Sequence, residues 1–211
     1  MSNQKNVILA IESAICGGSI SLLNNGVEMA NWIGSSNVSR AEDLLFNIDA
    51  ILTSTNISRH DIDLVAVSAG PGSFTGIRIG LATALGLKAG LGIEMASESA
   101  LKAMVWDKSA SQSLTAALPV GRKSICLQKF QIVDRELVPL DDPHTLPDDV
   151  FFEFVRGEKD TEFVLHESLY ERGDAMSPIT NFGMNLAFAI GSICAEHPGL
   201  VAEPLFISKS A

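Results

Sequence analysis

The stretch best suited to chemistry is a run of glycines and hydroxyl residues, Gly70-Pro71-Gly72-Ser73-Phe74-Thr75-Gly76-Ile77-Arg78-Ile79-Gly80. It follows an apolar run at 62–69 that is typical of a strand, and it leads into residues 81–89, which favour a helix. A glycine-rich turn between a strand and a helix directs free backbone N–H groups toward an anion. The candidate anion-binding residues of this turn are Gly72, Ser73, Thr75 and Gly76.

The spacing within this run matches none of the common nucleotide or nucleophile motifs. A dinucleotide fingerprint needs glycine at its sixth place, which is Thr75 when counted from Gly70. A Walker A loop ends in Gly-Lys-Ser/Thr, and no lysine lies between Gly70 and Ile77. The G-x-S-x-G elbow also fails around Ser73. A tight turn that permits close packing therefore competes with an anion site as the explanation.

Two rows of small residues follow along the helix at a spacing of four. Each interior glycine costs about 1 kcal/mol relative to alanine, so close approach of a neighbouring backbone must offset that cost. Charge is confined to Arg78 and Lys88, and a helix that is apolar all round is buried all round. One side can pack on the sheet, and the other needs a neighbouring helix or another polypeptide. The rows are Gly76, Gly80 and Ala84, and Ala82, Gly86 and Gly90.

Outside the glycine run, the sequence contains no pattern typical of a metal site or of a pair of acid–base catalysts. The histidines form no HxxxH or HExxH pattern, and the cysteines form no CxxC pair. His166 and Glu167 are adjacent on a predicted strand and so point to opposite faces. We expect no metal site, and we expect reduced, buried thiols. The isolated residues are His60, His144, His197, Cys16, Cys126 and Cys194.

Composition limits the partners of the chain. Its 211 residues, 46% of them hydrophobic, suffice for one large domain or two small ones. The net charge of −10 repels nucleic acid, so we expect no direct contact with it. The apolar run Val7–Ile11 is too short for a signal sequence or a membrane span. We therefore expect a cytoplasmic protein without membrane contact.

The elements that position the glycine run alternate in a definite order. Asn24-Asn25-Gly26 is a hairpin turn, and Ser39–Glu42 is a capping box that opens a helix with one apolar face. The predicted order is strands Val7–Ser13, Ser19–Leu23 and Val27–Ile33, a helix over 41–53, strand 62–69 and helix 76–91.

The second half repeats this order. Its turn lies at Gly121-Arg122-Lys123, and Pro139–Pro147 is predicted to be irregular. The predicted elements are strands Leu114–Val120, Ile125–Ile132 and Glu136–Val138, helix Asp148–Val155, strand Glu162–His166, and a helix from Ser177-Pro178 to Ala195.

The order strand-strand-strand-helix-strand-helix, found twice, resembles the duplicated fold of actin, sugar kinases and chaperone ATPase domains. This resemblance implies an α/β protein of two actin-like (ASKHA) lobes, at residues 1–106 and 107–211, the second reduced. Glu12 ends the first strand near where actin-like kinases place an acidic residue for metal–nucleotide work. The alternative role for Glu12 is that of a turn residue that caps the hairpin.

With these residues in view, the chain resembles the TsaB (YeaZ) family, subunits of the bacterial machinery that makes threonylcarbamoyladenosine in tRNA. The resemblance rests on Leu9–Ser13, on Glu42-Asp43-Leu44-Leu45 and above all on Gly70–Gly80. Weaker similarity lies at Gly121-Arg122 and Ala202–Leu205. Residues 120–122 and 206–208 of the second lobe depart from the family pattern.

The resemblance implies a non-catalytic subunit that binds and activates the homologous TsaD subunit, which carries the metal, with the ATPase TsaE joining them. The pairing uses the two helices of the first lobe, here 41–53 and 76–91. No cofactor is expected on the chain alone, and ATP or ADP only at the interface with partners. Carried over by position, the partner-binding residues are Leu44, Leu45, Ile48, Leu52, Ile77, Arg78, Gly80, Leu81 and Ala84.

Alone, the chain is expected to form a homodimer through the same helices, because an apolar face of this kind rarely stays bare. The rival hypothesis is a stand-alone actin-fold kinase or ATPase that depends on ATP. It requires two acidic strand-end residues facing a nucleotide cleft. A peptidase, suggested by the older naming of related proteins, lacks metal ligands and a Ser/His/Asp set.

Overall fold

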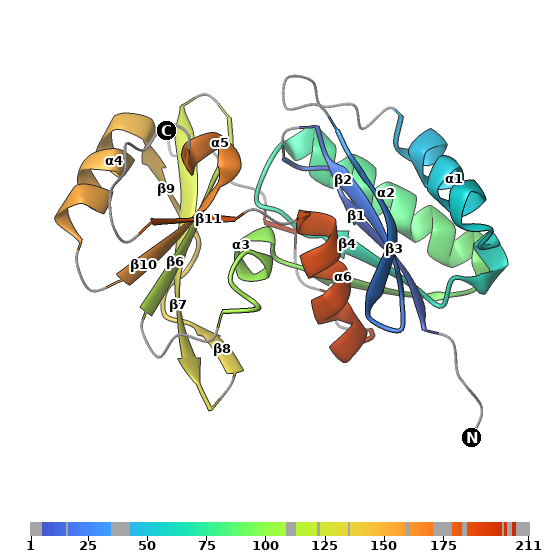
Figure 1. The fold of residues 1–211 in the computed structure, drawn as a ribbon. Helices are drawn as coiled ribbons and strands as arrows, with labels where there is room; N and C mark the ends of the chain where they lie inside the picture. The colour runs from blue at the N-terminus through green and yellow to red at the C-terminus, as the bar shows by residue number, and fades with distance from the viewer. Residues whose placement is uncertain are drawn as a thin grey trace. The chain divides into compact units, whose positions relative to one another are not determined.

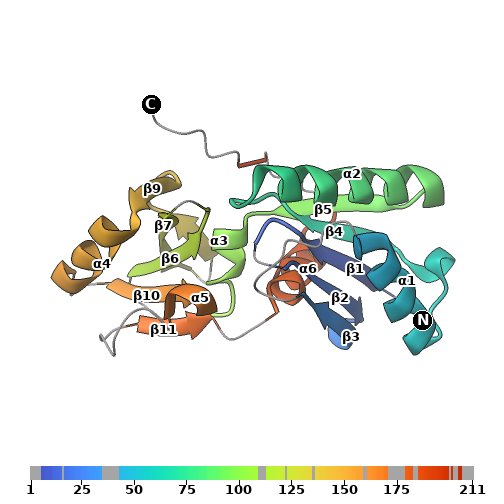
Figure 2. The same ribbon diagram turned by 90° about the horizontal axis from the view of Figure 1, so that it is seen from above.

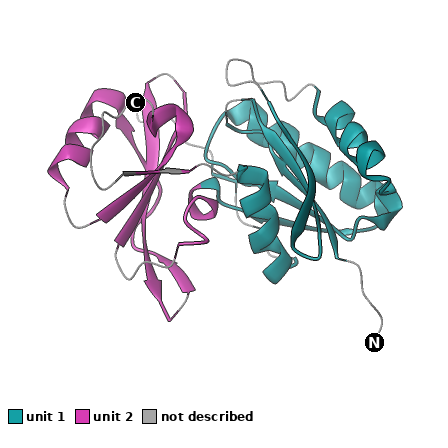
Figure 3. Cartoon of the chain, in the orientation of Figure 1, with its two compact units in different colours: residues 1–100, 184–206 teal, residues 101–183, 207–211 magenta. Residues whose placement is uncertain are grey.

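A computed structural model describes residues 6–15, 17–34, 43–108, 113–121, 123–134, 136–158, 161–170, 179–182, 185–199, 201 and 204–205. The chain divides into two compact units (Figure 3). Unit 1 comprises residues 1–100 and 184–206, and unit 2 comprises residues 101–183 and 207–211. Each unit contains one sheet with helices packed on it, as the ribbons of Figures 1 and 2 show.

The sheet of unit 1 is built around its first strand. The strand order is β3-β2-β1-β4-β5, in which β1 pairs antiparallel with β2 and parallel with β4. Every residue of β1 is buried, as expected for a strand covered on both faces. The bounds are β1 Val7–Glu12, β2 Ser19–Asn24, β3 Val27–Ile33, β4 Leu64–Ser68 and β5 Glu94–Glu98.

Helices α1 (Leu44–Thr55) and α2 (Phe74–Leu91) cover one face of this sheet. They share one hydrophobic core with β1, β2, β4 and β5, and a short 3-10 turn, η2 (Arg59–Asp61), follows α1. Helix α1 begins later than predicted, at Leu44, and its N-cap residue Asp43 makes no side-chain capping bond. The predicted capping box at 39–42 lies outside the described residues.

Helix α6 (Leu186–Glu196) comes from the end of the chain and packs on β1, β2, β4 and β5. A Cβ on Gly191 would lie 2.9 Å from both Ala10 Cβ and Leu23 Cδ1, so the glycine permits a close approach to the sheet. The Ala187 N–H donates to Ser19 Oγ at 3.2 Å. The sequence-based boundary at 106/107 assigns this helix to the second lobe, whereas it belongs to the core of unit 1.

The sheet of unit 2 has the order β11-β10-β6-β7-β8, and β9 also pairs with β7. Helix α4 packs on this sheet through Phe151. The rings of Phe151 and Phe163 lie edge to face, with 6.4 Å between their centroids. The bounds are β6 Ser113–Pro119, β7 Ser124–Val133, β8 Glu136–Pro139, β9 His144–Pro147, β10 Thr161–His166, β11 Ile179–Phe182, α4 Asp148–Gly157 and α5 Glu167–Tyr170.

The two sheets share one topology. In each, the central first strand (β1 or β6) is followed on one side by two strands joined through antiparallel pairings, and on the other side by two strands joined through parallel pairings. The predicted elements of the first half are followed by strand β5 and the short helix α3 (Ala100–Ala103), and in the second half β10 is followed by α5, β11 and α6. The prediction of a duplicated, actin-like α/β fold is confirmed.

Two predictions in the second half were wrong. Residues 179–182 form strand β11, parallel to β10, where a helix from Ser177-Pro178 was predicted. The stretch predicted as irregular contains β9, which pairs with β7 at Ser124–Leu127. Both strands are only four residues long, too short for alternation to reveal them, and pairing with a longer strand stabilises each. No helix among the described residues is long and apolar enough to cross a membrane.

Candidate functional site

The glycine run forms the turn between β4 and α2. Ser73 is the N-cap of α2, and its Oγ accepts a hydrogen bond from the Gly76 N–H at 3.3 Å. The Ser73 N–H donates to Ala14 O at 2.7 Å, so the loop after β1 holds the turn from beneath. The sequence thus places a capped helix start directly against a second loop.

The first row of small residues on α2, the packed row of Gly76, Gly80 and Ala84, is buried. A Cβ on Gly76 would overlap the carbonyl oxygen of Ser13, and one on Gly80 would overlap Ser13 Oγ. Ser13 Oγ donates to Gly76 O at 2.8 Å. Close approach of the β1 loop therefore offsets the helix propensity that these glycines lack.

The second row, the open row of Ala82, Gly86 and Gly90, is exposed. A Cβ on Gly86 or Gly90 would meet no atom within 4 Å. Nothing in the described part of unit 1 therefore explains why these positions lack a side chain. Leu85, which is 55% exposed, lies beside this row.

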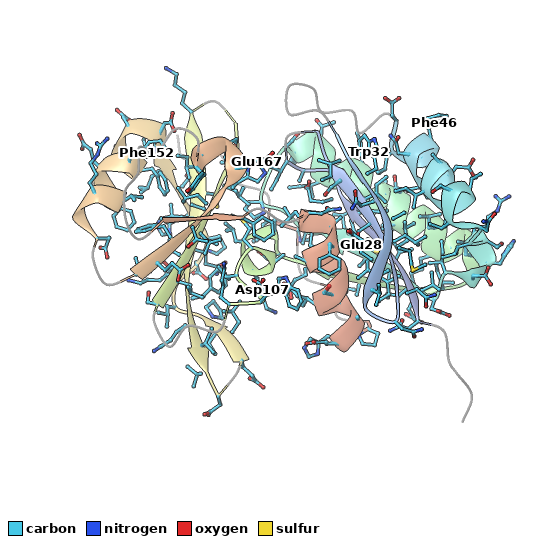
Figure 4. The ribbon with its side chains drawn as sticks, in the orientation of Figure 1. Glu28, Trp32, Phe46, Asp107, Phe152 and Glu167 are labelled. Carbon is cyan, nitrogen blue, oxygen red and sulfur yellow. The ribbon has the colours of Figure 1, made fainter. Side chains whose placement is uncertain are left out.

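Large apolar side chains on the outer sides of α1 and α2 are also exposed. Phe46 (labelled in Figure 4) is 76% exposed and Leu45 is 64% exposed. On α2, the ring of Phe74 is covered by the guanidinium of Arg78, whose Cζ lies 3.7 Å from the ring centroid. We use the term helical face for the open row together with Leu45, Phe46, Phe74, Arg78 and Leu85.

The structure separates the residues predicted to bind a partner into two groups. Leu45 and Arg78 are exposed and Leu81 is half-buried, so these three are available for contact. The others are buried and hold the helices on the sheet, because the apolar stripe of each helix faces its own core. These are Leu44, Ile48, Leu52, Ile77, Gly80 and Ala84.

The residues predicted to bind an anion are mostly occupied by contacts within the protein. The N–H groups of Ser73 and Gly76 already have acceptors, and Gly72 is half-buried. Only Ser73 and Thr75 of this set are exposed. The anion site therefore stays a prediction.

Glu12 is buried at the end of β1 and turns back on its own loop. Its Oε1 accepts the N–H groups of Ala14 at 2.5 Å and Ile15 at 3.0 Å. Burial raises the pKa of the Glu12 carboxyl to about 7, and these two hydrogen bonds lower it only in part. This geometry matches the role of a turn residue, which the sequence analysis left open.

Sequence analysis missed Glu98, at the carboxyl end of β5. It is 5% exposed, lies opposite Ser68 of β4, and accepts the Ser99 N–H at 2.8 Å. With β1 next to β4, two buried carboxylates end strands on one edge of the sheet. The signal was an acidic residue two positions after the apolar pair Met95-Ala96.

The described histidines do not converge. His166 Nδ1 lies 2.9 Å from Ser168 Oγ, and burial lowers its pKa. His144 Nδ1 lies 3.8 Å from an Asp141 oxygen on an exposed loop of unit 2. Within the part of the chain that the structure describes, no three His, Cys, Asp or Glu residues are grouped to hold a metal ion.

Comparison with known families gives one family model. The model described as "TsaD: tRNA N6-adenosine threonylcarbamoyltransferase" matches residues 37–156.

Among curated proteins, the TsaB tRNA threonylcarbamoyladenosine biosynthesis protein of Escherichia coli K12 is 32% identical over 127 residues, 59% of this chain and 54% of that protein. A tRNA N6-adenosine threonylcarbamoyltransferase of Staphylococcus haemolyticus is 31% identical over 101 residues, 40% of this chain and 30% of that protein. The chain spans about half the length of the first TsaB relatives it matches.

Among solved structures, YeaZ from Pseudomonas aeruginosa aligns with a TM-score of 0.66 at 16% identity, over 96% of this chain and 100% of that one. The ethanolamine utilization protein EutJ from Carboxydothermus hydrogenoformans aligns with a TM-score of 0.53 at 9% identity, over 89% of each chain. At these identities the two structures are similar to this chain in fold.

Proposed function

This chain belongs to the family of the TsaD model, and we propose that it acts as a non-catalytic subunit of the TsaB (YeaZ) type in tRNA threonylcarbamoyladenosine biosynthesis. It binds a TsaD-type threonylcarbamoyltransferase through the helical face and stabilises the active state of that enzyme. The observation that carries this proposal is the open row of α2, where a Cβ on either glycine would meet no atom within 4 Å in the part of the chain that the structure describes.

Several features of the helical face support a protein partner. Small residues let a second helix approach closely, and Leu45, Phe46 and Leu85 supply apolar area for it to cover. This chain matches both TsaB and threonylcarbamoyltransferase relatives, so the two partners share a fold. Without its partner, the chain pairs with a second copy through the same face. A TsaE-type ATPase joins the complex, and ATP or ADP binds only at the interface with partners.

The acidic net charge fits a subunit that leaves contact with tRNA to its partner. Glu12, the residue nearest to a catalytic role, directs its carboxylate at the backbone of its own loop. The proposal therefore assigns no chemical step to this chain.

A binding experiment with a matched control tests the proposal. Gly86→Arg places a long charged side chain on the open row, and Gly157→Arg places the same side chain at the end of α4, where a Cβ also meets no atom. With the cognate threonylcarbamoyltransferase, light scattering should show a complex for the wild-type chain and Gly157→Arg, and none for Gly86→Arg. No complex with the wild-type chain, or equal binding by all three, contradicts the proposal.

A second candidate, a stand-alone ATP-dependent kinase or ATPase, is favoured by one observation. Glu12 and Glu98 are buried at the ends of β1 and β5, as a metal–nucleotide site would require. Calorimetry with Mg-ATP on the isolated chain distinguishes the two. Tight binding of Mg-ATP that is abolished by Glu98→Gln supports the kinase or ATPase. If Mg-ATP does not bind, the result supports the non-catalytic subunit.

A further inference from the structure

A buried backbone carbonyl stands at the turn that leads from β4 to α2. Ala69 is fully buried; its N–H donates to Glu98 O at 2.9 Å, and its carbonyl accepts the Leu205 N–H at 2.8 Å. The next carbonyl, that of Gly70, accepts the Ala100 N–H at 2.7 Å. The residues that start α2 are therefore held partly by the end of the chain.

Two described residues near the C-terminus, Val201 and Leu205, contact the edge strand β5 and this turn. Val201 forms a parallel bridge with Ser97 of β5, beyond which Leu205 is half-buried. A Cβ on Gly70 would lie 3.2 Å from Leu205 O, and the φ of Gly70 is +92°. Glycine at position 70 thus permits both the positive φ of the turn and the close approach of Leu205.

A buried carbonyl that loses its hydrogen-bond donor costs free energy, so the turn must shift to find another donor when the Leu205 N–H is removed. Ser73, the N-cap of α2, follows Gly70 closely along the chain. The other bonds to this turn involve Ala14, Ser68, Glu98 and Ala100, all of which belong to residues 1–100 of unit 1. The hydrogen bond from the Leu205 N–H is thus the contribution of the C-terminal segment to holding this turn.

We propose that Leu205 is a positioning residue, whose backbone N–H fixes the turn at Ala69-Gly70. By fixing this turn, Leu205 holds the first turns of α2 in place. Phe74 and Arg78 on these turns are then positioned for a partner. This inference rests on the proposed function as far as the partner is concerned. The holding of the turn itself does not depend on it.

A pair of substitutions at one position separates the backbone bond from the side chain. Leu205→Pro removes the N–H, and Leu205→Ala keeps it while shortening the side chain. We expect Leu205→Pro to speed amide hydrogen exchange at residues 74–78 about tenfold relative to Leu205→Ala, as the loss of one buried bond implies. Self-association, measured by sedimentation equilibrium, should weaken by a similar factor, about tenfold.

Three results decide the inference. Equal exchange in the two variants overturns it, and so does faster exchange with unchanged self-association. A fall in Tm with exchange accelerated throughout unit 1 shows a merely structural role and also overturns it. A wild-type chain that does not self-associate contradicts the proposed homodimer, while the exchange comparison still decides whether Leu205 holds the turn.

Discussion

The packed and open rows of α2 have nearly the same composition and lie on one helix, yet their surroundings are opposite. Gly76 and Gly80 cannot carry a side chain because Ser13 occupies the space, whereas a Cβ on Gly86 or Gly90 would meet no atom within 4 Å among the described residues. Glycine weakens a helix equally in both rows. The fold explains the packed row, and the proposed partner explains the open row. Substitutions in the two rows should therefore act on different measurable quantities.

The largest effect is expected from Gly76→Ala. The new Cβ overlaps a backbone oxygen, which cannot rotate away, so the β1 loop or the helix must shift. We expect a loss of about 3 kcal/mol of unfolding free energy, measured by urea denaturation. A stability equal to wild type would remove the difference between the rows.

The loop beneath the packed row should also make stability depend on pH. The Glu12 pKa is about 7 in the folded chain against an ordinary value of 4.5, so the folded chain holds a proton that the unfolded chain releases. This contribution is complete below pH 4.5 and is lost as the pH rises through 7. Wild type should lose on the order of 3 kcal/mol relative to Glu12→Gln over that range. Urea titrations at both ends of the range measure the loss, and parallel pH curves for the two proteins contradict it.

In the open row, Gly86→Ala should stabilise the isolated chain. A Cβ meets no atom there, and alanine favours the helix by about 1 kcal/mol. The same substitution should weaken self-association, because the methyl group keeps a second helix at a distance. Urea denaturation and sedimentation equilibrium measure the two effects. A gain in stability with unchanged self-association would place the partner elsewhere.

The smallest effect concerns Arg78 and Phe74 at the edge of the helical face. Their cation–π contact is exposed, and a double-mutant cycle with Arg78→Met and Phe74→Leu should give a coupling of about 0.5 kcal/mol. Repeating the cycle on self-association should give a larger coupling, since a partner removes water from the pair. Equal couplings would exclude this pair from the interface.

The two rows of small residues could be predicted from the sequence because a spacing of four residues along a helix can be recognised without the tertiary fold. They could not tell which row is covered, since that depends on Ser13, which is far away in the sequence. For the same reason Leu44, Ile48 and Leu52 were predicted to meet a partner, although the spacing of an apolar stripe is the same whether it faces a core or another protein.

Long-range pairing explains the other differences. Glu98 becomes part of the strand-end edge only because β5 lies beside β4, and no local pattern near residue 98 specifies that neighbour. The assignment of α6 to the second lobe followed chain order, but Gly191 of this helix fits against Ala10 and Leu23 of the first sheet. Both depend on contacts between distant parts of the sequence.

The return of α6 to unit 1 also bears on the order of synthesis. The ribosome releases β1 to β5 well before α6, with all the strands of unit 2 made in between. One face of the first sheet, including Ala10 and Leu23, therefore emerges without the helix that later covers it. Until α6 is made, this face of the sheet exposes apolar side chains that the folded chain buries. A chain halted before residue 186 would remain trapped in that state.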